Sequence, residues 1–282
     1  MRILVLGAGG QLGRDLLRVF AEDGDVIGLT HSDLNIIEGP EVKRAIDDIA
    51  PDLVLNAAAY TDVEKAEDDE RGAFHTNANG AQRVAEACHA REVALVYFST
   101  DFVFDGAKGR PYEPEDKPNP QSVYARSKLR GEENTRWTNR MSFVIRTAWL
   151  YGPGGNNFVE KILKAAAARP SLRVVNDEFG SPTYTRDLAV AARAIVPTKQ
   201  YGIYHAVNEG FCSRYDFALA ILREAGVDTP VEPCSASEYP MKARRPAYSV
   251  LSNAKLTATC GFAMPTWQDA LRRYMKERGR HG

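Results

Sequence analysis

The sequence lacks most of the features that mark specialised classes of protein. Its 282 residues include only four cysteines, without CxxC or metal-ligand spacing, which argues against a disulfide framework or a zinc site. Lysine and arginine, 36 in all, nearly balance the 37 aspartates and glutamates, so no excess positive charge indicates a nucleic-acid binder. No segment approaches the roughly 20 apolar residues of a membrane span. We therefore expect a cytoplasmic globular protein without a nucleic-acid, membrane or metal partner.

The first half of the chain alternates short apolar runs with helical patterns. Strands separated by helices predict parallel βαβ units, and strands that are apolar throughout predict a sheet with helices on both faces. The expected fold class is therefore α/β, with a doubly wound parallel sheet. The expected strands are residues 2–6, 25–29, 52–59, 93–100 and 142–149, and the expected helices begin near Gln11 and Pro40, span about 73–90 and begin again near Tyr124.

The regular alternation of expected strands and helices ends after Trp149, which marks a second region. The turn cluster YGPGGNN follows, and the later helices, including one over 213–225 and one that Thr266 caps, are joined by proline-rich connections. We expect a main domain over residues 1–150 and a smaller lobe over residues 151–282. Some segments of the smaller lobe are expected to return to the main sheet.

A glycine-rich turn, GAGGQLG, follows the first expected strand and opens the first expected helix. Its glycines Gly7, Gly10 and Gly13 are three residues apart. Such a turn lets the backbone approach a pyrophosphate closely, and it aims the free N–H groups and positive dipole end of a helix at that group. A glycine-rich loop without a ligand is the alternative. The position between a strand and a helix favours the dinucleotide site of a Rossmann-like domain.

Tyr124 and Lys128 stand four residues apart in the segment SVYARSKLRGEE, so on a helix they share one face. A positive charge about 5 Å from a phenol, at an effective dielectric near 20, favours the phenolate by roughly 3 kcal/mol, or about two pKa units. We therefore expect Lys128 to lower the pKa of Tyr124 and to make it useful in proton transfer. A chance occurrence of this spacing is the alternative.

Further segments carry motifs of a known family: NAAAYTDVEKAE (56–67), FSTDFVFDG (98–106), RTAWLYGPGGNNF (146–158) and VVNDEFGSPT (174–183). With the glycine-rich turn and the YxxxK pair, they resemble the extended short-chain dehydrogenase/reductase superfamily and, within it, the dTDP-4-dehydrorhamnose reductase family. The resemblance spans nearly the whole chain. It implies NAD(P)H-dependent reduction of the C4 ketone of a dTDP-4-dehydro-6-deoxy-hexose by a monomer or homodimer, with dTDP-4-dehydro-L-rhamnose as the expected substrate.

The resemblance also implies roles for individual residues. Tyr124 would donate a proton to the ketone oxygen, Thr100 would hydrogen-bond the same oxygen, and Lys128 would hold the nicotinamide ribose. The implied cofactor-binding residues are Gly7, Gly10, Gln11, Leu12, Gly13, Thr30, Asp33, Leu34, Ala59, Tyr60, Thr61, Tyr124 and Lys128. The implied substrate-binding residues are Thr100, Asp101, Tyr124, Trp149, Asn157 and Arg245. A core position for Trp149 and a solvated position for Arg245 are the alternatives.

The end of the second expected strand bears on the choice of cofactor. Many NAD-binding relatives carry an acidic residue there, which hydrogen-bonds the adenosine ribose and repels a 2′-phosphate. This chain has Thr30 or His31 at that place, and Arg14 and Ser32 are candidates to accept a phosphate. We therefore expect NADPH as the cofactor, with NADH as the alternative.

The residues after Thr100 separate the expected reaction from those of related enzymes. Nucleotide-sugar dehydratases carry an acidic pair after the threonine, whereas here Asp101 is followed by Phe102, which cannot transfer a proton. Epimerases of this branch usually keep the acidic ribose partner that is missing at Thr30. Two alternatives stay open: a reductase of a related nucleotide deoxysugar in a secondary-metabolite or glycan pathway, and a non-catalytic nucleotide-binding subunit of the same fold.

Overall fold

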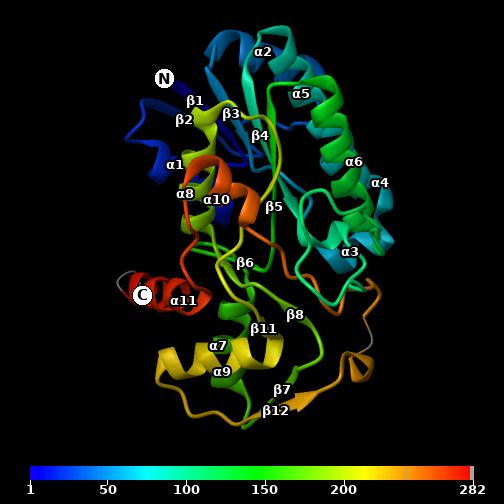
Figure 1. Ribbon diagram of the computed structural model, residues 1–282, viewed down its shortest axis with the longest axis vertical. Coiled ribbons are helices and arrows are strands. Elements are labelled where there is room, and N and C mark those ends of the chain that lie inside the picture. The colour runs from blue at the N-terminus through cyan, green and yellow to red at the C-terminus, as the bar shows by residue number, and fades with distance from the viewer. Residues whose placement is uncertain (240, 280–282) are drawn as a thin grey trace.

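The computed structural model describes residues 1–239 and 241–279, so residues 240 and 280–282 of the expected smaller lobe lie outside the described part. A six-stranded sheet runs through the larger part of the molecule (Figure 1). Its order is β10-β5-β4-β3-β1-β2 and every neighbouring pair is parallel, which confirms the expected doubly wound α/β fold. The strands are β1 (Arg2–Leu6), β2 (Asp25–Leu29), β3 (Leu53–Asn56), β4 (Ala94–Thr100), β5 (Ser142–Thr147) and β10 (Gly202–His205).

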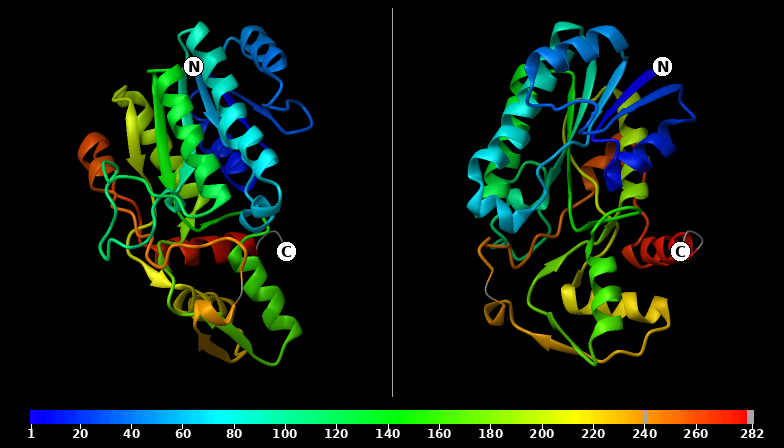
Figure 2. Two further views of the ribbon diagram at one scale, coloured as in Figure 1. Left: turned by 90° about the vertical axis from the view of Figure 1, so that its right-hand side faces the viewer. Right: turned by 180° about the vertical axis from the view of Figure 1, so that it is seen from behind.

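Helices cover both faces of this sheet (Figures 1 and 2). One face carries α1 and α8 side by side, with α10 next to α8. The other face carries α2 and α5, with α6 packed beside α5. The helices of the two layers are α1 (Gln11–Phe20), α8 (Thr185–Ile195) and α10 (Ala254–Cys260), and α2 (Gly39–Ile49), α5 (Ala81–Ala90) and α6 (Val123–Thr138).

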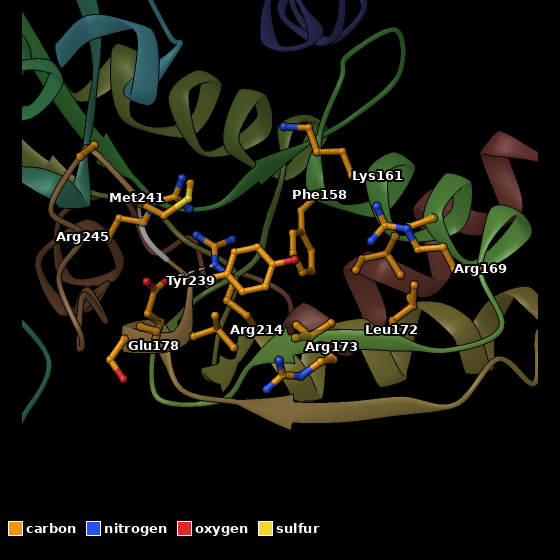
Figure 3. Close-up of a pocket in the computed structure, with 17 residues that line it drawn as sticks. Phe158, Lys161, Arg169, Leu172, Arg173, Glu178, Arg214, Tyr239, Met241 and Arg245 are labelled. Atoms are coloured by element: carbon orange, nitrogen blue, oxygen red, sulfur yellow. Dashed lines mark ion pairs between the residues drawn. The ribbon is translucent and has the colours of Figure 1, made fainter. Parts of the chain in front are cut away.

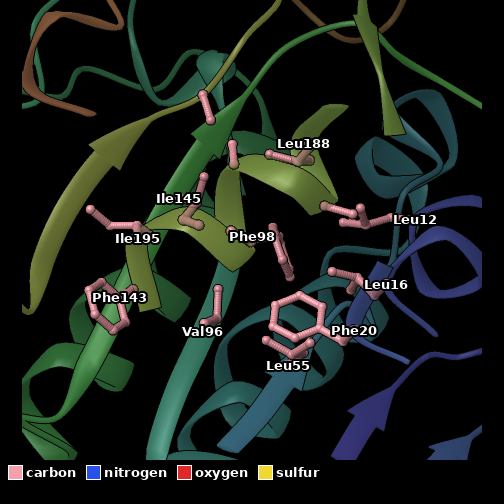
Figure 4. Close-up of a cluster of buried hydrophobic side chains, with 14 of the residues drawn as sticks. Leu12, Leu16, Phe20, Leu55, Val96, Phe98, Phe143, Ile145, Leu188 and Ile195 are labelled. Carbon is pink, nitrogen blue, oxygen red and sulfur yellow. The ribbon is translucent and has the colours of Figure 1, made fainter. Parts of the chain in front are cut away.

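The larger hydrophobic core lies between α1, α8 and the sheet (Figure 4). Leu16 and Phe20 of α1 are one turn apart, so the helical repeat turns both toward the sheet. Leu188 and Ile195 of α8 pack into the same cluster, which also includes Val96 of β4. Because α8 follows part of the smaller lobe in the sequence, residues from both halves of the chain build this core.

Polar caps fix where two of the helices begin. Ser122 accepts a hydrogen bond from the backbone nitrogen of Ala125 at 3.2 Å, at the start of α6. Thr266 accepts one from the backbone nitrogen of Asp269 at 3.3 Å, at the start of α11 (Trp267–Arg278). Each cap satisfies an N–H group that has no partner within its helix. The cap predicted at Thr266 is confirmed.

The long helix predicted between the third and fourth strands is interrupted. It consists of α4 (Glu70–Phe74), a π-helical segment (His75–Gly80) and α5. Asn77 lies in the π-helical segment, accepts a hydrogen bond from the Tyr60 backbone nitrogen at 2.8 Å, and donates to Ser127 Oγ at 2.9 Å. The widened turn thus presents a side chain that ties the loop after β3 to α6, which the sequence pattern did not reveal.

Strands β3 and β5 end earlier than predicted, at Asn56 and Thr147. After Asn56 the chain crosses the edge of the sheet and enters the short helix α3 (Val63–Asp68). Shortly after Thr147, Trp149 adopts a left-handed backbone conformation with φ 46°, which is incompatible with a continuing strand. Both departures occur at the carboxyl edge of the sheet, where open α/β folds bind ligands.

The smaller lobe has a hydrophobic core of its own and packs against one end of the sheet (Figures 1 and 2). This core joins α7, α9 and α11 to the pair formed by β7 and β12. Among the helices of the described residues, none is long and apolar enough to cross a membrane. The lobe contains α7 (Phe158–Ala168), α9 (Arg214–Ala225), β7 (Leu172–Val175), β12 (Val231–Cys234), β6 (Leu150–Tyr151), β9 (Thr183–Tyr184), β8 (Phe179–Gly180) and β11 (Cys212–Ser213).

Candidate active site

The glycine-rich turn lies between β1 and α1 at the carboxyl edge of the sheet. Gly7 has φ 75°, and a Cβ atom there would lie 2.7 Å from the backbone nitrogen of Ala58. A Cβ atom at Gly13 would lie 2.3 Å from the carbonyl oxygen of Gly7. Side chains are therefore excluded at both positions. Gly10 begins α1 without a side-chain cap, which leaves the first N–H groups of this helix free for a ligand.

A cavity of about 1000 Å³ opens beside this turn, beyond the carboxyl ends of the strands. We call it the large cleft. It brings together the glycine-rich turn, the loops after β2 and β3, and the first turns of α6, and its place is that of a ligand site in an open α/β sheet. The expected site residues that line it are Gly7, Gly10, Gln11, Leu12, Gly13, Thr30, Ala59, Thr61, Tyr124, Lys128 and Arg245.

Several buried polar atoms at the strand ends have no hydrogen-bond partner among the described residues. They include Asn56 Nδ2, Ser99 Oγ and Thr147 Oγ1, at the carboxyl ends of β3, β4 and β5. Ser99 and Thr147 also line the large cleft. Unpaired buried polar groups are uncommon in folded proteins. Together with the free N–H groups of α1, they fit a large polar ligand such as a nicotinamide dinucleotide.

Three of the expected cofactor residues are not part of the cleft lining. Asp33 turns back on the chain and accepts hydrogen bonds from the Thr30 nitrogen at 2.9 Å and Thr30 Oγ1 at 2.6 Å. Leu34 is buried in the core beneath α2 and α5. Tyr60 packs near Val123 at the start of α6. The cleft wall after β2 is formed by Thr30, His31 and Ser32.

Lys128 lies one turn after Tyr124 on α6 and is only 3% exposed. Its Nζ donates a hydrogen bond to the Phe98 carbonyl oxygen at 2.6 Å and lies 4.1 Å from the centre of the Tyr97 ring. Burial lowers the pKa of Lys128 to about 7, and the negative charge of Glu132 opposes this shift. The ammonium is therefore held in place before any ligand reaches it.

Tyr124 begins the same helix face and is partly exposed to the large cleft. Burial raises the pKa of Tyr124 to about 12, and its interaction with the Thr100 hydroxyl offsets part of this rise. The expectation that Lys128 lowers the pKa of Tyr124 is wrong for this structure, because burial has the largest effect and raises that pKa. At neutral pH the phenol therefore carries its proton, as a general acid must.

Thr100 and Asp101 follow directly at the end of β4. Thr100 Oγ1 donates a hydrogen bond to Asp101 Oδ1 at 3.1 Å and accepts one from the Phe102 nitrogen at 3.2 Å. Asp101 is 2% exposed, and its Oδ2 has no partner among the described residues. Burial raises the pKa of Asp101 to about 6. A buried carboxyl group with a free oxygen thus lies next to Thr100.

A fully buried ion pair lies behind this face of α6. Arg146 of β5 donates to the Glu132 carboxylate through Nε at 2.9 Å and Nη2 at 2.7 Å, and both side chains are 1% exposed. Arg146 Nη1 donates to the Pro114 carbonyl oxygen at 3.3 Å. Since Glu132 is one turn beyond Lys128, the pair fixes the helix that presents Lys128 and Tyr124.

A second cavity, of about 640 Å³, opens in the smaller lobe between α7, β7 and residues 236–239 and 241–245 (Figure 3). We call it the small-lobe pocket. It shares Lys161 and Arg245 with the large cleft, so the two cavities are neighbours. Its lining combines aromatic, aliphatic and basic side chains, among them Phe158, Arg173, Arg214 and Tyr239.

Trp149 borders this region in a constrained conformation. Its left-handed backbone is unusual for a bulky residue, and such strain is often found at functional sites. Gly180 lies against its ring, because a Cβ atom there would be only 2.5 Å from Cε2. The guanidinium carbon of Arg214 lies 3.5 Å from the ring centre. The expected substrate residue is thus packed between a glycine and an arginine that the sequence motifs did not single out.

Comparisons with known proteins agree with this arrangement. The family described as "RmlD substrate binding domain" matches residues 1–279. The spore coat polysaccharide biosynthesis protein SpsK of Bacillus subtilis is 42% identical over 278 residues, which are 98% of each chain. The crystal structure of a dTDP-4-dehydrorhamnose reductase from Clostridium acetobutylicum superposes with a TM-score of 0.97 at 38% identity, over 99% of this chain and 100% of that one. The chain belongs to the dTDP-4-dehydrorhamnose reductase family.

As a member of the dTDP-4-dehydrorhamnose reductase family, the protein is an NAD(P)-dependent oxidoreductase of the dTDP-sugar reductase type. The dTDP-4-dehydrorhamnose reductase of Bacillus anthracis was solved in complex with NADP. That structure has a TM-score of 0.95 at 36% identity, over 98% of this chain and 99% of that one. The family, the fold and the enzyme class expected from the motifs are confirmed.

In this member of the dTDP-4-dehydrorhamnose reductase family, the expected substrate residues Asn157 and Arg245 differ in whether they face a cavity. Asn157 caps α7, accepting from the Glu160 nitrogen at 3.2 Å, and donates to the Gly152 carbonyl oxygen at 3.0 Å. Its neighbour Asn156 lines the large cleft. Arg245 lines both cavities. The polar groups of Asn157 are thus engaged within the chain, whereas Arg245 faces both cavities.

The motifs missed two basic residues beside the cavities. Arg214 is the first residue of α9, directly after the N-cap Ser213. A positive charge at a helix N-terminus is disfavoured by the helix dipole, so the position of Arg214 in the sequence could have marked it as unusual. Lys161 of α7 lines both cavities and makes no ion pair within the described part of the chain. Nothing in the sequence distinguishes Lys161 from an ordinary surface lysine.

Proposed function

We propose that this protein uses NADPH to reduce the C4 ketone of dTDP-4-dehydro-L-rhamnose and forms dTDP-L-rhamnose. The observation that carries the proposal is the meeting of Tyr124, Lys128 and the glycine-rich turn in the large cleft. In this proposal residues 1–150 bind the cofactor, and most of residues 151–282 bind the nucleotide sugar. Relatives named dTDP-4-dehydrorhamnose reductase support the same reaction.

Tyr124 is the proton donor of the proposed reaction. When bound in the large cleft, the reduced nicotinamide supplies the hydride that the ketone carbon takes up. Tyr124 gives its phenolic proton to the ketone oxygen, and the Thr100 hydroxyl hydrogen-bonds the same oxygen. The raised pKa of Tyr124 supports this role, because the proton is present at neutral pH.

Lys128 holds the ribose of the cofactor in this proposal, as the family pattern implies. Its contacts with the Phe98 carbonyl oxygen and the Tyr97 ring support this role, because an ordered side chain loses less entropy on binding. The glycines and the free N–H groups of α1 would hold the pyrophosphate. The proposed contacts of the cofactor further include Gln11, Leu12, Thr30, Ala59 and Thr61, which line the large cleft.

Of the proposed substrate contacts, Tyr124 and Arg245 line the cavities, whereas Thr100, Asp101, Trp149 and Asn157 belong to neither lining. The unpaired Oδ2 of Asp101 supports a hydrogen bond to a sugar hydroxyl. The ring of Trp149 offers an apolar surface to the face of the sugar. Arg245 is suited to a phosphate oxygen because arginine forms charge-assisted bonds to phosphate. Asn157 would act mainly through the loop that it ties to the start of α7.

The direct test of the proposed reaction is Tyr124→Phe, which keeps the ring and removes the proton donor. Turnover of dTDP-4-dehydro-L-rhamnose, followed by NADPH oxidation, should fall by at least about 100-fold. NADPH binding, measured separately by fluorescence, should change little. Tyr201→Phe is the matched control, because Tyr201 packs on Phe143 away from both cavities. Turnover within a few-fold of wild type in Tyr124→Phe would reject the proposed role.

The preference for NADPH rests on the cleft wall after β2. Thr30, His31 and Ser32 line this wall, and the Asp33 carboxylate is turned onto Thr30. A 2′-phosphate would therefore meet hydroxyl groups and an imidazole in place of a repelling carboxylate. Equilibrium titrations with both reduced cofactors test this preference. Tighter binding of NADPH supports it, and equal or tighter binding of NADH contradicts it.

A reductase of a related nucleotide deoxysugar is the second candidate function. The observation that favours it is the 42% identity to SpsK, a protein named for spore coat polysaccharide biosynthesis. Both candidates use the same residues for hydride and proton transfer, so only the sugar differs. Turnover measured across a panel of dTDP-4-keto sugars, with product identification by NMR, separates the two.

A further inference from the structure

We propose that Tyr97 is a positioning residue for Lys128, whose ring lies against the ammonium group and keeps it charged at the cofactor site. The inference rests on the role proposed for Lys128 in binding the cofactor, and it adds a residue that the sequence motifs did not single out. Tyr97 belongs to β4, is 1% exposed and lines neither cavity, so it acts through Lys128 and not on a ligand directly.

The ammonium group of Lys128 lies over the face of the Tyr97 ring. Nζ is 4.1 Å from the ring centre, and it donates to the carbonyl oxygen of Phe98, the next residue of β4, at 2.6 Å. The face of an aromatic ring carries partial negative charge, and it attracts a cation most strongly where water is excluded. Lys128 is buried, so solvent weakens this attraction little. An ammonium group has three N–H donors, and two therefore remain for a ligand in the large cleft, which Lys128 lines.

The Tyr97 ring is itself held at its far end. Its hydroxyl donates a hydrogen bond at 3.1 Å to the carbonyl oxygen of Asn77, in the π-helical segment. Gly131 of α6 leaves room for this bond, because a Cβ atom there would lie 2.1 Å from the Asn77 oxygen and 2.3 Å from the Tyr97 hydroxyl. The π-helical segment thus anchors the ring against which Lys128 lies.

Lys128 needs such a contact because its surroundings oppose its charge. Burial lowers the pKa of Lys128 to about 7, and the negative charge of Glu132 counteracts part of this lowering. Glu132 is paired with Arg146, so the pair as a whole carries no net charge. Burial also raises the pKa of Tyr97 well above its ordinary value, so the phenol stays neutral and only its ring acts on the cation. With a pKa near neutrality, a buried cation–π contact decides how much of Lys128 is charged.

The described residues supply no ion pair to the Lys128 ammonium. Tyr124, one turn earlier on α6, keeps its proton at neutral pH because burial raises its pKa to about 12. Further ionisable groups of the elements packed against α6 are engaged elsewhere or exposed: Asp101 with Thr100, Glu67 with the Val123 nitrogen, Glu70 with Arg126, and His75 in solvent. The Tyr97 ring and the Phe98 carbonyl oxygen are therefore the direct partners of the ammonium group.

The experiment measures the affinity for NADP⁺ by calorimetry between about pH 5.5 and pH 9, without turnover. The affinity of the wild type should fall with rising pH once free Lys128 loses its proton, and Lys128→Met identifies this part of the profile. In Tyr97→Leu the fall should begin about one pH unit lower, because the charged form loses the ring. The affinity should then drop by up to about 10-fold at pH 8 but by less than about twofold at pH 5.5.

Tyr97→Phe keeps the ring and should restore the profile to within about 0.3 pH unit of wild type. Tyr97→Met is a second variant without a ring, and its flexible side chain fills the same space if Tyr97→Leu does not fold. Tyr204→Leu is the matched control. Tyr204 is a buried tyrosine of the same sheet, its hydroxyl donates to the Gln200 carbonyl oxygen at 2.6 Å, and it lines neither cavity. Its replacement should leave the pH at which the affinity falls unchanged.

A wild-type profile in the variants without a ring would overturn the inference, and so would an equal loss of affinity at every pH, which indicates a structural defect. A shift in Tyr97→Phe as large as that in Tyr97→Leu would also overturn it, because the hydroxyl and not the ring would then be responsible. An unchanged profile in Lys128→Met would reject the role proposed for Lys128, and the inference with it. Turnover in Tyr124→Phe tests the proton donor and remains a separate result.

Discussion

Two arginines, one in each part of the molecule, differ in how their charges are paired. Arg146 lies within the large sheet, is 1% exposed, and donates hydrogen bonds to Glu132 and the Pro114 carbonyl oxygen. Arg214 lies in the smaller lobe, stacks on Trp149, and keeps a buried Nε–H without a partner among the described residues. Arg146 is thus paired within the fold, whereas Arg214 keeps hydrogen-bonding capacity that the described part of the fold does not use.

The largest effect on stability is expected from breaking the ion pair between Arg146 and Glu132. Glu132→Met leaves the Arg146 charge buried without its partner, and the free energy of unfolding should fall by about 3–5 kcal/mol. Urea denaturation followed by circular dichroism measures this change. The double variant Glu132→Met/Arg146→Met removes both charges and should recover most of the stability. A single variant as stable as wild type would show that the pair contributes nothing.

The two arginines also differ in how readily they can be recognised in the sequence. Strand β5, which carries Arg146, ends two residues earlier than expected, but its presence follows from an apolar run and was predicted. The pairing of Arg146 with Glu132 was not, because it joins a strand to a helix through tertiary packing. Arg214 carried a weak local signal, a positive charge at the start of a helix.

Other parts of the site were beyond sequence reasoning for similar physical reasons. The π-helical turn around Asn77 depends on contacts with Tyr60 and Ser127, which come from other elements. The pKa of Tyr124 is set mainly by burial, which depends on tertiary packing and not on the i, i+4 spacing to Lys128. Motifs therefore located the site, while the direction of side chains within it required the fold.

An intermediate effect on stability is expected at His205, which lies close enough to Arg146 to feel its charge. His205 is fully buried, its Nδ1 lies 3.1 Å from the Tyr112 carbonyl oxygen, and burial lowers its pKa to about 3, with Arg146 adding to the shift. The negative charge of Asp116 opposes this lowering of the pKa, and the positive charge of Lys255 adds to it. Unfolded His205 takes up a proton near pH 6.5, whereas folded His205 does not until about pH 3.

The stability contributed by neutral His205 is therefore complete above pH 6.5 and lost progressively as the pH falls toward 3. Between these values the group should contribute a slope of about 1.4 kcal/mol per pH unit to the free energy of unfolding. His205→Asn should reduce the slope measured by urea denaturation between pH 6.5 and 5. An unchanged slope in this variant would assign the acid sensitivity to other groups.

The smallest effect on stability is expected at the unpaired arginine. Arg214→Leu removes a charge whose nearest acidic contact is 3.7 Å away, so the free energy of unfolding should change by less than about 1 kcal/mol in either direction. Arg193→Leu, which removes a partly exposed arginine bonded to Glu22 and Asp23, provides the comparison for an ordinary surface ion pair. A loss above 2 kcal/mol in Arg214→Leu, measured by urea denaturation, would place Arg214 with Arg146 as a structural residue.

The place of β10 in the sheet has a consequence for how the protein is made. A nascent chain that has reached residue 150 has β1 to β5 but lacks α8, which covers Val96 and Ile145, and β10, which pairs with β5. An uncovered apolar face and an open strand edge invite association with other chains. The chain must therefore emerge from the ribosome as far as His205, less than halfway through residues 151–282, before β10 can complete the six-stranded sheet.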